Sequence, residues 1–235
     1  SGEVACIADA GEITHIRTAC ASAMATDILA RPDAVRLTVY GCGAQAATHI
    51  HALSRVRPLE QVAVWGRSFE RANDFARRMA EETGLDVVAE ADGAAAASQA
   101  DIICTVTGSA TPVLFGEWVK PGTHVNAVGS SYAGPVEVDT RLVLASRYIA
   151  DSRASAVAAA AELILAREAG ALTNAHVAAE IGEVLLGKLP GRTSPDEITF
   201  YKSLGHVVQD LAATRYLHLK AIAEEDVSTP AQRGL

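Results

Sequence analysis

Short apolar runs alternate with helix-like stretches along most of this 235-residue chain, and this alternation constrains its fold more than any other feature. The first run is VRLTVY (35–40), and apolar residues with helical spacing follow it from about residue 44. The later runs that predict strands are 61–65, 86–90, 101–108, 123–130 and 147–151. Strands that alternate with helices predict a parallel sheet in a doubly wound α/β fold.

The two ends of the chain and one alanine-rich stretch predict further elements. Residues 3–9 predict a short strand, and the apolar spacing over 16–28 predicts a helix with Thr14 as its N-cap. Residues 152–170 predict a single helix. Residues 196–226 predict a strand-like lead followed by a long helix.

The composition narrows the class of protein. The net charge is −8, which disfavours a nucleic-acid or anionic-membrane partner, because both need a basic surface. The spacing of the four cysteines fits neither a zinc site nor a redox pair, so reduced cysteines and a cytoplasmic location are expected. No stretch reaches the roughly 18 apolar residues of a membrane helix. Residues 1–11 do not have the pattern of a signal peptide.

The stretch LTVYGCGAQA (37–46) has the form of a dinucleotide-binding turn between a strand and a helix. In such a turn the first glycine makes the bend, the second lets the backbone approach a pyrophosphate, and the third allows close helix–strand packing. Gly41 and Gly43 take the first two places, and Ala46 takes the third with one added methyl. A pyrophosphate is expected at the N-terminus of the following helix. The turn alone also fits an ordinary glycine-rich loop, so the prediction depends on the strand before it, the helix after it and the parallel sheet.

The end of the next strand, in VWGRSFER (64–71), indicates which dinucleotide binds. An NAD site usually has Asp or Glu there, about 20 residues after the turn, and this acid binds the ribose hydroxyls. This chain instead has Arg67 and Ser68, with Arg71 one turn into the helix. Guanidinium groups and a hydroxyl suit a 2′-phosphate, so NADPH is the expected cofactor and NADH the second choice. The alternative is that both arginines are solvated surface charges.

Six stretches, in order, resemble one family over nearly the whole chain from Gly11 to Ala213. They are ITHIRTACASAMAT, VYGCGAQA, VWGRS, THVNAVGSS, ADSRASA and EITFYKSLGHVVQDLAA. Together they resemble the ornithine cyclodeaminase/mu-crystallin family. The resemblance implies a Rossmann domain inserted between two parts of a dimerisation and substrate domain. It also implies a nicotinamide cofactor and amino-acid or cyclic-imine chemistry.

The resemblance also implies roles for individual residues. Arg17 of IRTA matches the arginine that holds the substrate carboxylate, for which a planar guanidinium fork is well suited. Lys202 matches a family lysine, and a structural role fits it as well as a functional one. The expected dinucleotide contacts are Gly41, Gly43, Ala44, Gln45, Arg67, Ser68, Arg71, Thr105, Val106, Thr107, Val128, Ser203 and Gly205. No metal site is expected, since His49 and His51 are two residues apart and do not share a helix face.

One departure from the family pattern concerns the reaction. The family's cyclodeaminases have a stretch similar to NAVGGD where this chain has NAVGSS. Ser131 therefore stands in place of the Asp used in ammonia loss and ring closure. A serine cannot serve as the same base, and Glu137 and Asp139 lie too far along the chain to replace it by a simple shift. Ser131 is a candidate catalytic residue because the resemblance puts residues 128–131 where the nicotinamide meets the substrate.

These observations favour NADPH-dependent reduction of a cyclic ketimine carboxylate, 1-pyrroline-2-carboxylate or 1-piperideine-2-carboxylate, to the cyclic amino acid. Hydride transfer to a preformed imine mainly needs a bound cofactor, an oriented carboxylate and a proton donor. Ornithine cyclodeaminase and alanine dehydrogenase are alternatives. A non-catalytic NADPH-binding protein of the mu-crystallin kind is the alternative from another class.

The second departure is one of length, because family members carry a further segment before the stretch that begins here at residue 2. The chain is therefore either a fragment or a naturally shortened form. We expect residues 1–30 to be a remnant of the dimerisation and substrate domain and 31–199 to be the Rossmann domain. Residues 200–235 are expected as a C-terminal helix that returns to the substrate domain. A homodimer is expected if the N-terminal segment is present.

Overall fold

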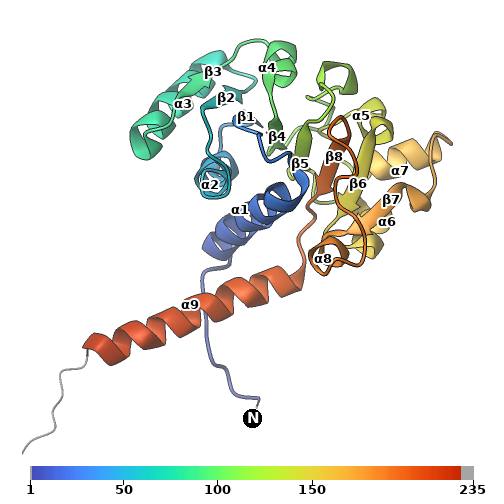
Figure 1. The fold of residues 1–235 in the computed structure, drawn as a ribbon. Coiled ribbons are helices and arrows are strands. Elements are labelled where there is room, and N and C mark those ends of the chain that lie inside the picture. Colours follow the sequence, from blue (N-terminus) through green and yellow to red (C-terminus); the bar gives the residue numbers. More distant parts are fainter. Residues whose placement is uncertain (1, 229–235) are drawn as a thin grey trace, which may run out of the picture.

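The centre of the fold is an all-parallel sheet in the order β3-β2-β1-β4-β5-β8-β6-β7 (Figure 1). This computed structural model describes residues 2–228 and the side chains of residues 2–223. The strands are β1 (Arg36–Tyr40), β2 (Gln61–Trp65), β3 (Val87–Ala89), β4 (Ile102–Thr105), β5 (His124–Ala127), β6 (Ser146–Ala150), β7 (Val177–Glu180) and β8 (Ile198–Lys202). Helices cover both faces of this sheet, so the predicted doubly wound α/β fold is confirmed.

Most helices begin next to a side chain that accepts hydrogen bonds from their first amides. Asp92 does so at α4 and Ser152 at α6, which is the usual role of an N-cap residue. The helices are α1 (Ala10–Leu29), α2 (Ala44–Leu53), α3 (Phe69–Thr83), α4 (Gly93–Gln99), α5 (Thr140–Ala145), α6 (Arg153–Ala159), α7 (Ala161–Glu168), α8 (Ile181–Leu185) and α9 (Val207–Ser228). Short 3-10 turns lie at Gly116–Trp118 and Asn174–His176.

Two main apolar cores lie on opposite faces of the sheet. Leu37 and Val39 of β1 belong to the core that also contains Phe75 and Met79 of α3. Tyr40, the next residue of β1, belongs to the other core, beneath α4, α5 and α7. Helix α1 lies beside α2 and below β5 (Figure 1). Because both faces are covered, the strands read in sequence as nearly continuous apolar runs.

Two strands end well before the apolar runs that predict them do. The run 101–108 gives β4, which ends at Thr105, and the run 123–130 gives β5, which ends at Ala127. The residues beyond these ends form loops at the carboxyl edge of the sheet. Open α/β folds bind their ligands at this edge.

The strand predicted at 3–9 is wrong, because residues 2–9 form neither helix nor strand. Val4 and Ile7 are 79% and 91% exposed, respectively. A strand is stable only when a neighbour pairs its backbone groups, and no strand within residues 2–228 lies beside this segment. An apolar, alternating run is therefore not sufficient to make a strand here.

The N-cap predicted for the first helix is also wrong. Helix α1 begins at Ala10, and the carboxylate of Asp9 accepts hydrogen bonds from Gly11 N at 2.8 Å and Glu12 N at 3.0 Å. Thr14 lies inside the helix instead. Aspartate and threonine are both good N-cap residues, and the sequence offered both within six positions of each other.

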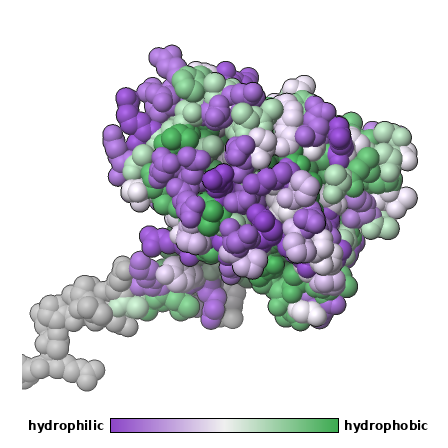
Figure 2. All heavy atoms as spheres, turned by 45° about the horizontal axis from the view of Figure 1, so that its top comes forward, coloured by the Kyte–Doolittle hydropathy of each residue, from purple (hydrophilic) through white to green (hydrophobic). Residues whose placement is uncertain are grey.

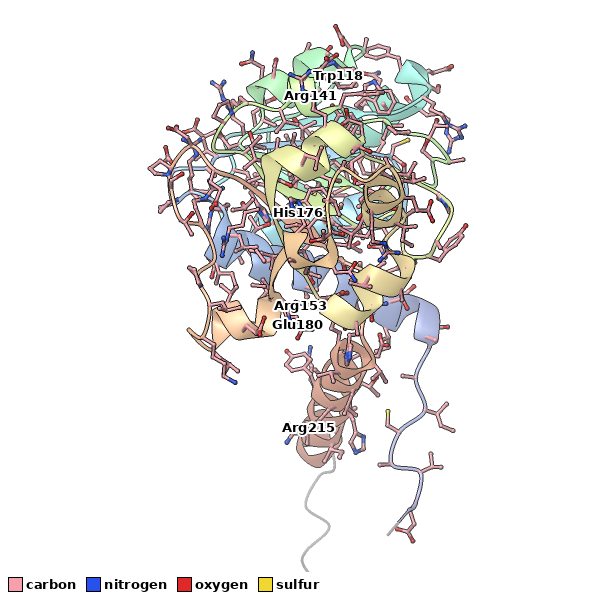
Figure 3. All side chains as sticks on the ribbon, turned by 90° about the vertical axis from the view of Figure 1, so that its right-hand side faces the viewer. Trp118, Arg141, Arg153, His176, Glu180 and Arg215 are labelled. Atoms are coloured by element: carbon pink, nitrogen blue, oxygen red, sulfur yellow. The ribbon has the colours of Figure 1, made fainter. Side chains whose placement is uncertain are left out.

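Residues 152–170, predicted as one helix, form two. Ala160 has extended backbone angles (φ −74°, ψ 103°) and separates α6 from α7. The strand β7 and the short helix α8 that follow were not predicted. The amide of Arg153 donates to Glu180 Oε1 at 2.7 Å, which ties the start of α6 to the end of β7 (Figure 3).

Helix α9 leaves the body of the molecule and extends away from it as an arm (Figures 1 and 3). Hydrophobic and hydrophilic side chains lie side by side on this arm (Figure 2). Its exposed apolar residues include Val207, Val208, Leu211, Tyr216 and Leu219. No helix within residues 2–228 is long and apolar enough to cross a membrane. The division into residues 1–30, 31–199 and 200–235 stays a prediction.

Candidate cofactor and substrate site

The glycine-rich turn after β1 has the backbone geometry expected of a dinucleotide-binding turn. Gly41 has φ 123°, and a Cβ there would lie 3.0 Å from the Val106 carbonyl oxygen. Gly43 is the N-cap of α2, and no side chain accepts from the first amides of this helix. Ala46 is fully buried, so its methyl fills the contact between helix and sheet. The turn therefore presents free backbone N–H groups, which favour an anion.

A cavity of about 510 Å³, here called the nucleotide cavity, lies over this turn at the carboxyl edge of the sheet. Its lining comes from the ends of β1, β2 and β4. The lining residues are Gly41, Cys42, Gly43, Trp65, Gly66, Arg67, Ser68, Arg71, Val106, Thr107, Gly108, Ser109 and Val113. This described lining contains two arginines, Arg67 and Arg71, and no carboxylate side chain. The cavity is therefore positively charged.

The three residues predicted to hold a 2′-phosphate lie together in the nucleotide cavity. Arg67 and Arg71 are exposed, and neither side chain makes a hydrogen bond or ion pair with the residues that the structure describes. Ser68 is the N-cap of α3, and its hydroxyl oxygen accepts from Arg71 N at 3.3 Å. Its proton remains available to a ligand. Two unpaired guanidinium groups and a hydroxyl are suited to a phosphate monoester.

A second cavity of about 320 Å³, here called the substrate cavity, adjoins the first. The two share Val106, Thr107 and Gly108, the residues that follow β4. The full lining of the substrate cavity is Thr14, Arg17, Thr18, Gln45, Val106, Thr107, Gly108, Val128, Gly129, Ser131, Ser203, Leu204 and Gly205. Helix α1, the start of α2 and the loops after β4, β5 and β8 therefore meet at one place.

Arg17 reaches the substrate cavity from α1 and is held from the side of α9. Its Nε lies 2.8 Å from Asp210 Oδ1, and its Nη1 donates to Gln209 Oε1 at 3.1 Å. A Cβ on Gly205 would lie 2.9 Å from both terminal nitrogens, so the guanidinium lies flat against the chain at this glycine. Nη2 makes no hydrogen bond to any described residue. The Arg17 side chain is only 15% exposed, so it has a fixed orientation toward the cavity.

The structure brings most of the predicted site residues to one or other cavity. Gln45, predicted to contact the dinucleotide, lines the substrate cavity, and Ser131 lies exposed at its edge. Ala44 and Thr105 line neither cavity. Thr105 is fully buried, and its hydroxyl donates to Glu137 Oε2 at 2.9 Å. The roles assigned to all these residues stay predictions.

Glu137 is the main feature of the site that the sequence did not reveal. It is 1% exposed and accepts hydrogen bonds from the residues that follow β4 and β5. Burial raises the pKa of this carboxyl, whereas the donors from Thr107 and Thr105 act in the opposite direction. Glu137 does not line the substrate cavity, so it does not take the place of the acid that Ser131 replaces. Asp139 also does not do so, because it caps α5 through Leu142 N.

Two more charged groups, one part-buried and one fully buried, hold the loops around the substrate cavity. Asp151 Oδ2 accepts from Leu204 N at 2.7 Å and Gly205 N at 2.6 Å. Lys202 is fully buried, and its Nζ donates to the Ser130 carbonyl at 2.6 Å and lies 3.4 Å from Glu162 Oε2. Lys202 lines neither cavity, so its contacts are with the loop and not with a ligand.

The fold and the cavities together have the form of a Rossmann protein, with a dinucleotide-binding turn beside a second cavity. Comparison with known proteins gives the family. The ornithine cyclodeaminase/mu-crystallin family matches residues 1–225, and the chain belongs to this family. The family assignment made from the six sequence stretches is therefore confirmed.

Relatives of known name include a reductase and a dehydrogenase. The ketimine reductase mu-crystallin of Mus musculus is 35% identical over 218 residues, which cover 93% of this chain and 66% of that protein. The Thermococcus litoralis Delta(1)-pyrroline-2-carboxylate reductase, solved with NADH and L-proline, has a TM-score of 0.88 at 30% identity. The match covers 91% of this chain and 66% of that one.

An archaeal alanine dehydrogenase dimer solved with bound NAD has a TM-score of 0.86 at 30% identity, covering 92% of this chain and 67% of that one. The chain thus spans about two thirds of the length of these relatives. The names of these three relatives are those of oxidoreductases, and the two solved structures hold NADH and NAD.

Proposed function

We propose that this chain binds NADPH and reduces a cyclic ketimine carboxylate, 1-pyrroline-2-carboxylate or 1-piperideine-2-carboxylate, to the cyclic amino acid. The observation that carries the proposal is the position of Arg17. It lies in a cavity that shares Val106–Gly108 with the cavity over the dinucleotide turn. Because the chain spans about two thirds of its relatives, the activity of the whole protein is part of the proposal.

The residues present fit a nicotinamide dinucleotide. Gly41 permits the close approach of the turn to Val106, and the N-terminus of α2 offers free amides to a pyrophosphate. When bound, the cofactor supplies the hydride. The chain binds and orients the substrate: Arg17 takes the carboxylate through its free Nη2 edge, and Ser131 offers a hydroxyl at the other side of the cavity.

The preference for NADPH over NADH is supported by Arg67, Ser68 and Arg71. These residues line the nucleotide cavity, and no carboxylate of the described lining is available to the ribose hydroxyls. The 2′-phosphate of NADPH would form charge-assisted hydrogen bonds there. The pyrroline-carboxylate reductase of T. litoralis was solved with NADH, so NADH remains the second choice.

Three other functions are the alternatives to this proposal. Ornithine cyclodeaminase needs an acid where this chain has Ser131, and the buried Glu137 does not reach the described cavity lining to replace it. Alanine dehydrogenase uses the same carboxylate and dinucleotide contacts and differs only in substrate. A non-catalytic NADPH-binding protein of the mu-crystallin kind would need the nucleotide cavity alone.

The test is to mix the chain with NADPH and 1-pyrroline-2-carboxylate and to follow the loss of nicotinamide absorbance. We expect turnover, and we expect Arg17→Met to abolish it while NADPH binding persists. Ornithine with NAD, and pyruvate with ammonia and NADH, are the parallel assays. Turnover in only one of these would replace the proposal with the corresponding alternative, and NADPH binding without turnover in any assay would favour the binding protein.

A homodimer and a cytoplasmic location are also proposed. A groove of about 500 Å³ between α1 and α9 is lined mainly by apolar side chains, including Ile13, Ile16, Met24, Tyr216 and Leu217. Exposed apolar surface of this kind favours association, and the archaeal relative was solved as a dimer. All four cysteines are unpaired, which supports a reducing compartment.

A further inference from the structure

The buried carboxylate of Glu137 joins the ends of two neighbouring strands. Its Oε1 accepts from Thr107 N at 2.5 Å and Thr107 Oγ1 at 2.7 Å. Its Oε2 accepts from Gly129 N at 2.7 Å and from Thr105 Oγ1 at 2.9 Å. Four donors on one carboxylate fill its acceptor capacity. Thr105 ends β4 and Gly129 follows β5, so a single side chain fixes both strand ends.

No basic residue within the described chain forms an ion pair with Glu137. The positive charge that lowers its pKa is that of Lys202, whose Nζ is already bound to Ser130 and close to Glu162. The carboxylate is thus held by backbone amides and hydroxyl groups rather than by a cation. Such donors point in fixed directions, so they define the positions of the loops more closely than a flexible ion pair would.

The loops that Glu137 holds form the wall between the two cavities. Thr107 lines both cavities, and Gly129 lines the substrate cavity. The contact between them is tight, because a Cβ on Gly129 would lie 2.0 Å from the Thr107 carbonyl oxygen and 2.5 Å from Glu137 Oε1. A small shift of either loop therefore changes the passage from one cavity to the other.

A dinucleotide whose pyrophosphate rests on α2 must place its two halves on opposite sides of β1. The adenosine half lies toward Arg67 at the end of β2, and the nicotinamide half lies toward the ends of β4 and β5. Only the second half passes the loops held by Glu137. The four hydrogen bonds of this carboxylate thus act on one half of the ligand.

We propose that Glu137 is a positioning residue that fixes the loops after β4 and β5 and thereby forms the seat of the nicotinamide half of the dinucleotide. The proposal rests on the proposed function. Glu137 belongs to neither described cavity lining, so its effect passes through Thr107 and Gly129.

The test compares two ligands: NADPH, and 2′-phospho-ADP-ribose, which has the same adenosine half and pyrophosphate but no nicotinamide. Their binding to the chain is measured by calorimetry. Glu137→Gln keeps the size of the side chain but turns one acceptor into a donor, which then faces a backbone N–H. We expect this variant to weaken NADPH binding by about tenfold or more and to leave binding of 2′-phospho-ADP-ribose within about twofold.

The matched control is Asp101→Asn, since Asp101 is another buried carboxylate, 7% exposed, that lies away from both linings. It is expected to lower thermal stability without changing the ratio of the two affinities. Thr105→Val removes one donor to Glu137 from a fully buried side chain that lines neither cavity, and it is a milder second variant if Glu137→Gln does not fold. This variant should also weaken NADPH binding selectively, but by a smaller factor than Glu137→Gln.

Equal weakening of both ligands, or no weakening of NADPH, in the folded variant overturns the proposal. A wild-type chain that binds 2′-phospho-ADP-ribose and NADPH equally also overturns it, because the nicotinamide half would then have no seat. A wild-type chain that binds neither ligand contradicts the proposed function itself, which separates the two failures.

Discussion

Arg17 and Arg67 lie at the two ends of the site, and they differ in whether a carboxylate already neutralises the charge. Arg17 is paired with Asp210 at 2.8 Å, whereas Arg67 has no carboxylate partner among the described residues. A partly neutralised arginine suits a monoanion, while Arg67 together with Arg71 suits the larger charge of a phosphate monoester. The two ends are therefore expected to select different anions.

At the nucleotide end, we predict that Arg67→Asp shifts the preference from NADPH to NADH. The loss of a charge-assisted hydrogen bond and the added negative charge should lower kcat/KM for NADPH by roughly tenfold or more. The value for NADH should stay the same or rise. Arg55→Asp makes the same charge change at an exposed position away from the cavity and should alter neither value. An unchanged preference in Arg67→Asp would contradict the 2′-phosphate assignment.

At the substrate end, we predict that Arg17→Lys raises KM for the imine carboxylate by about tenfold or more. The ammonium keeps the charge but loses the planar fork that holds two oxygens. NADPH affinity, measured by nucleotide fluorescence, should not change, because Arg17 lines the substrate cavity and not the nucleotide cavity. An equal loss of NADPH affinity would mean that Arg17 supports the dinucleotide instead.

Among single residues, those in local motifs were predictable and Glu137 was not. Gly41, Arg67 and Arg17 each belong to a short pattern next to one element, and the structure places all three in the cavities. Glu137 meets Thr107 across 30 residues and Gly129 across eight, through a loop whose path the sequence does not encode locally. Its distance along the chain from the other site residues made Glu137 a poor candidate, although the loop brings it back to the end of β5.

At the scale of elements, the strand cores were predictable and their ends were not. The apolar runs of β4 and β5 continue through Val106 and Val128, but the strands end one residue earlier and these two residues line the substrate cavity. An apolar residue in a cavity wall looks the same in sequence as one in a strand. The break at Ala160 is hidden for a similar reason, since nothing distinguishes it from the alanines on either side.

The contact between α1 and α2 contains a histidine that makes stability depend on pH. Burial lowers the pKa of His49 from 6.5 to about 4. Its Nδ1–H donates to the Gln45 carbonyl at 2.7 Å, so its Nε2 accepts from the Ser22 hydroxyl at 2.9 Å, which fixes the neutral tautomer. Burial also lowers the pKa of His124, to about 3. Both imidazoles are therefore neutral in the folded chain at pH values where they are charged in the unfolded chain.

We predict that the free energy of unfolding falls as the pH drops below about 6.5. The unfolded chain binds protons there that the folded chain does not, so each imidazole removes about 2 kcal/mol by pH 5. Urea titrations should show a smaller loss between about pH 7 and pH 5 in His49→Leu than in the wild type. Ile50→Val removes a methylene group from a buried, non-titratable residue of the same helix and should leave the slope unchanged. A rise in stability toward acid pH would contradict the assignment.

At the scale of the whole molecule, the arm formed by α9 presents apolar side chains beside the groove against α1. If this surface associates, burying it stabilises the assembly by about 25 cal/mol for each Å² of apolar area. We predict that the chain sediments as a dimer and that Tyr216→Asp, which puts a charge into the groove, shifts it to the monomer. Lys188→Asp, at an exposed residue outside the groove, should not. A monomeric wild-type chain at high concentration would contradict the prediction.

The order of the strands in the sheet also determines when the sheet can be completed during synthesis of the chain. β8 comes last among the described strands, yet it lies between β5 and β6. On the ribosome, β1 to β5 can pair with one another as they emerge, but β6 and β7 have no place in the sheet until residues 198–202 are synthesised. Until then β5 presents an unpaired edge, which is a site for misassociation. Slow translation before residue 198 would prolong this vulnerable state and increase the chain's dependence on chaperones.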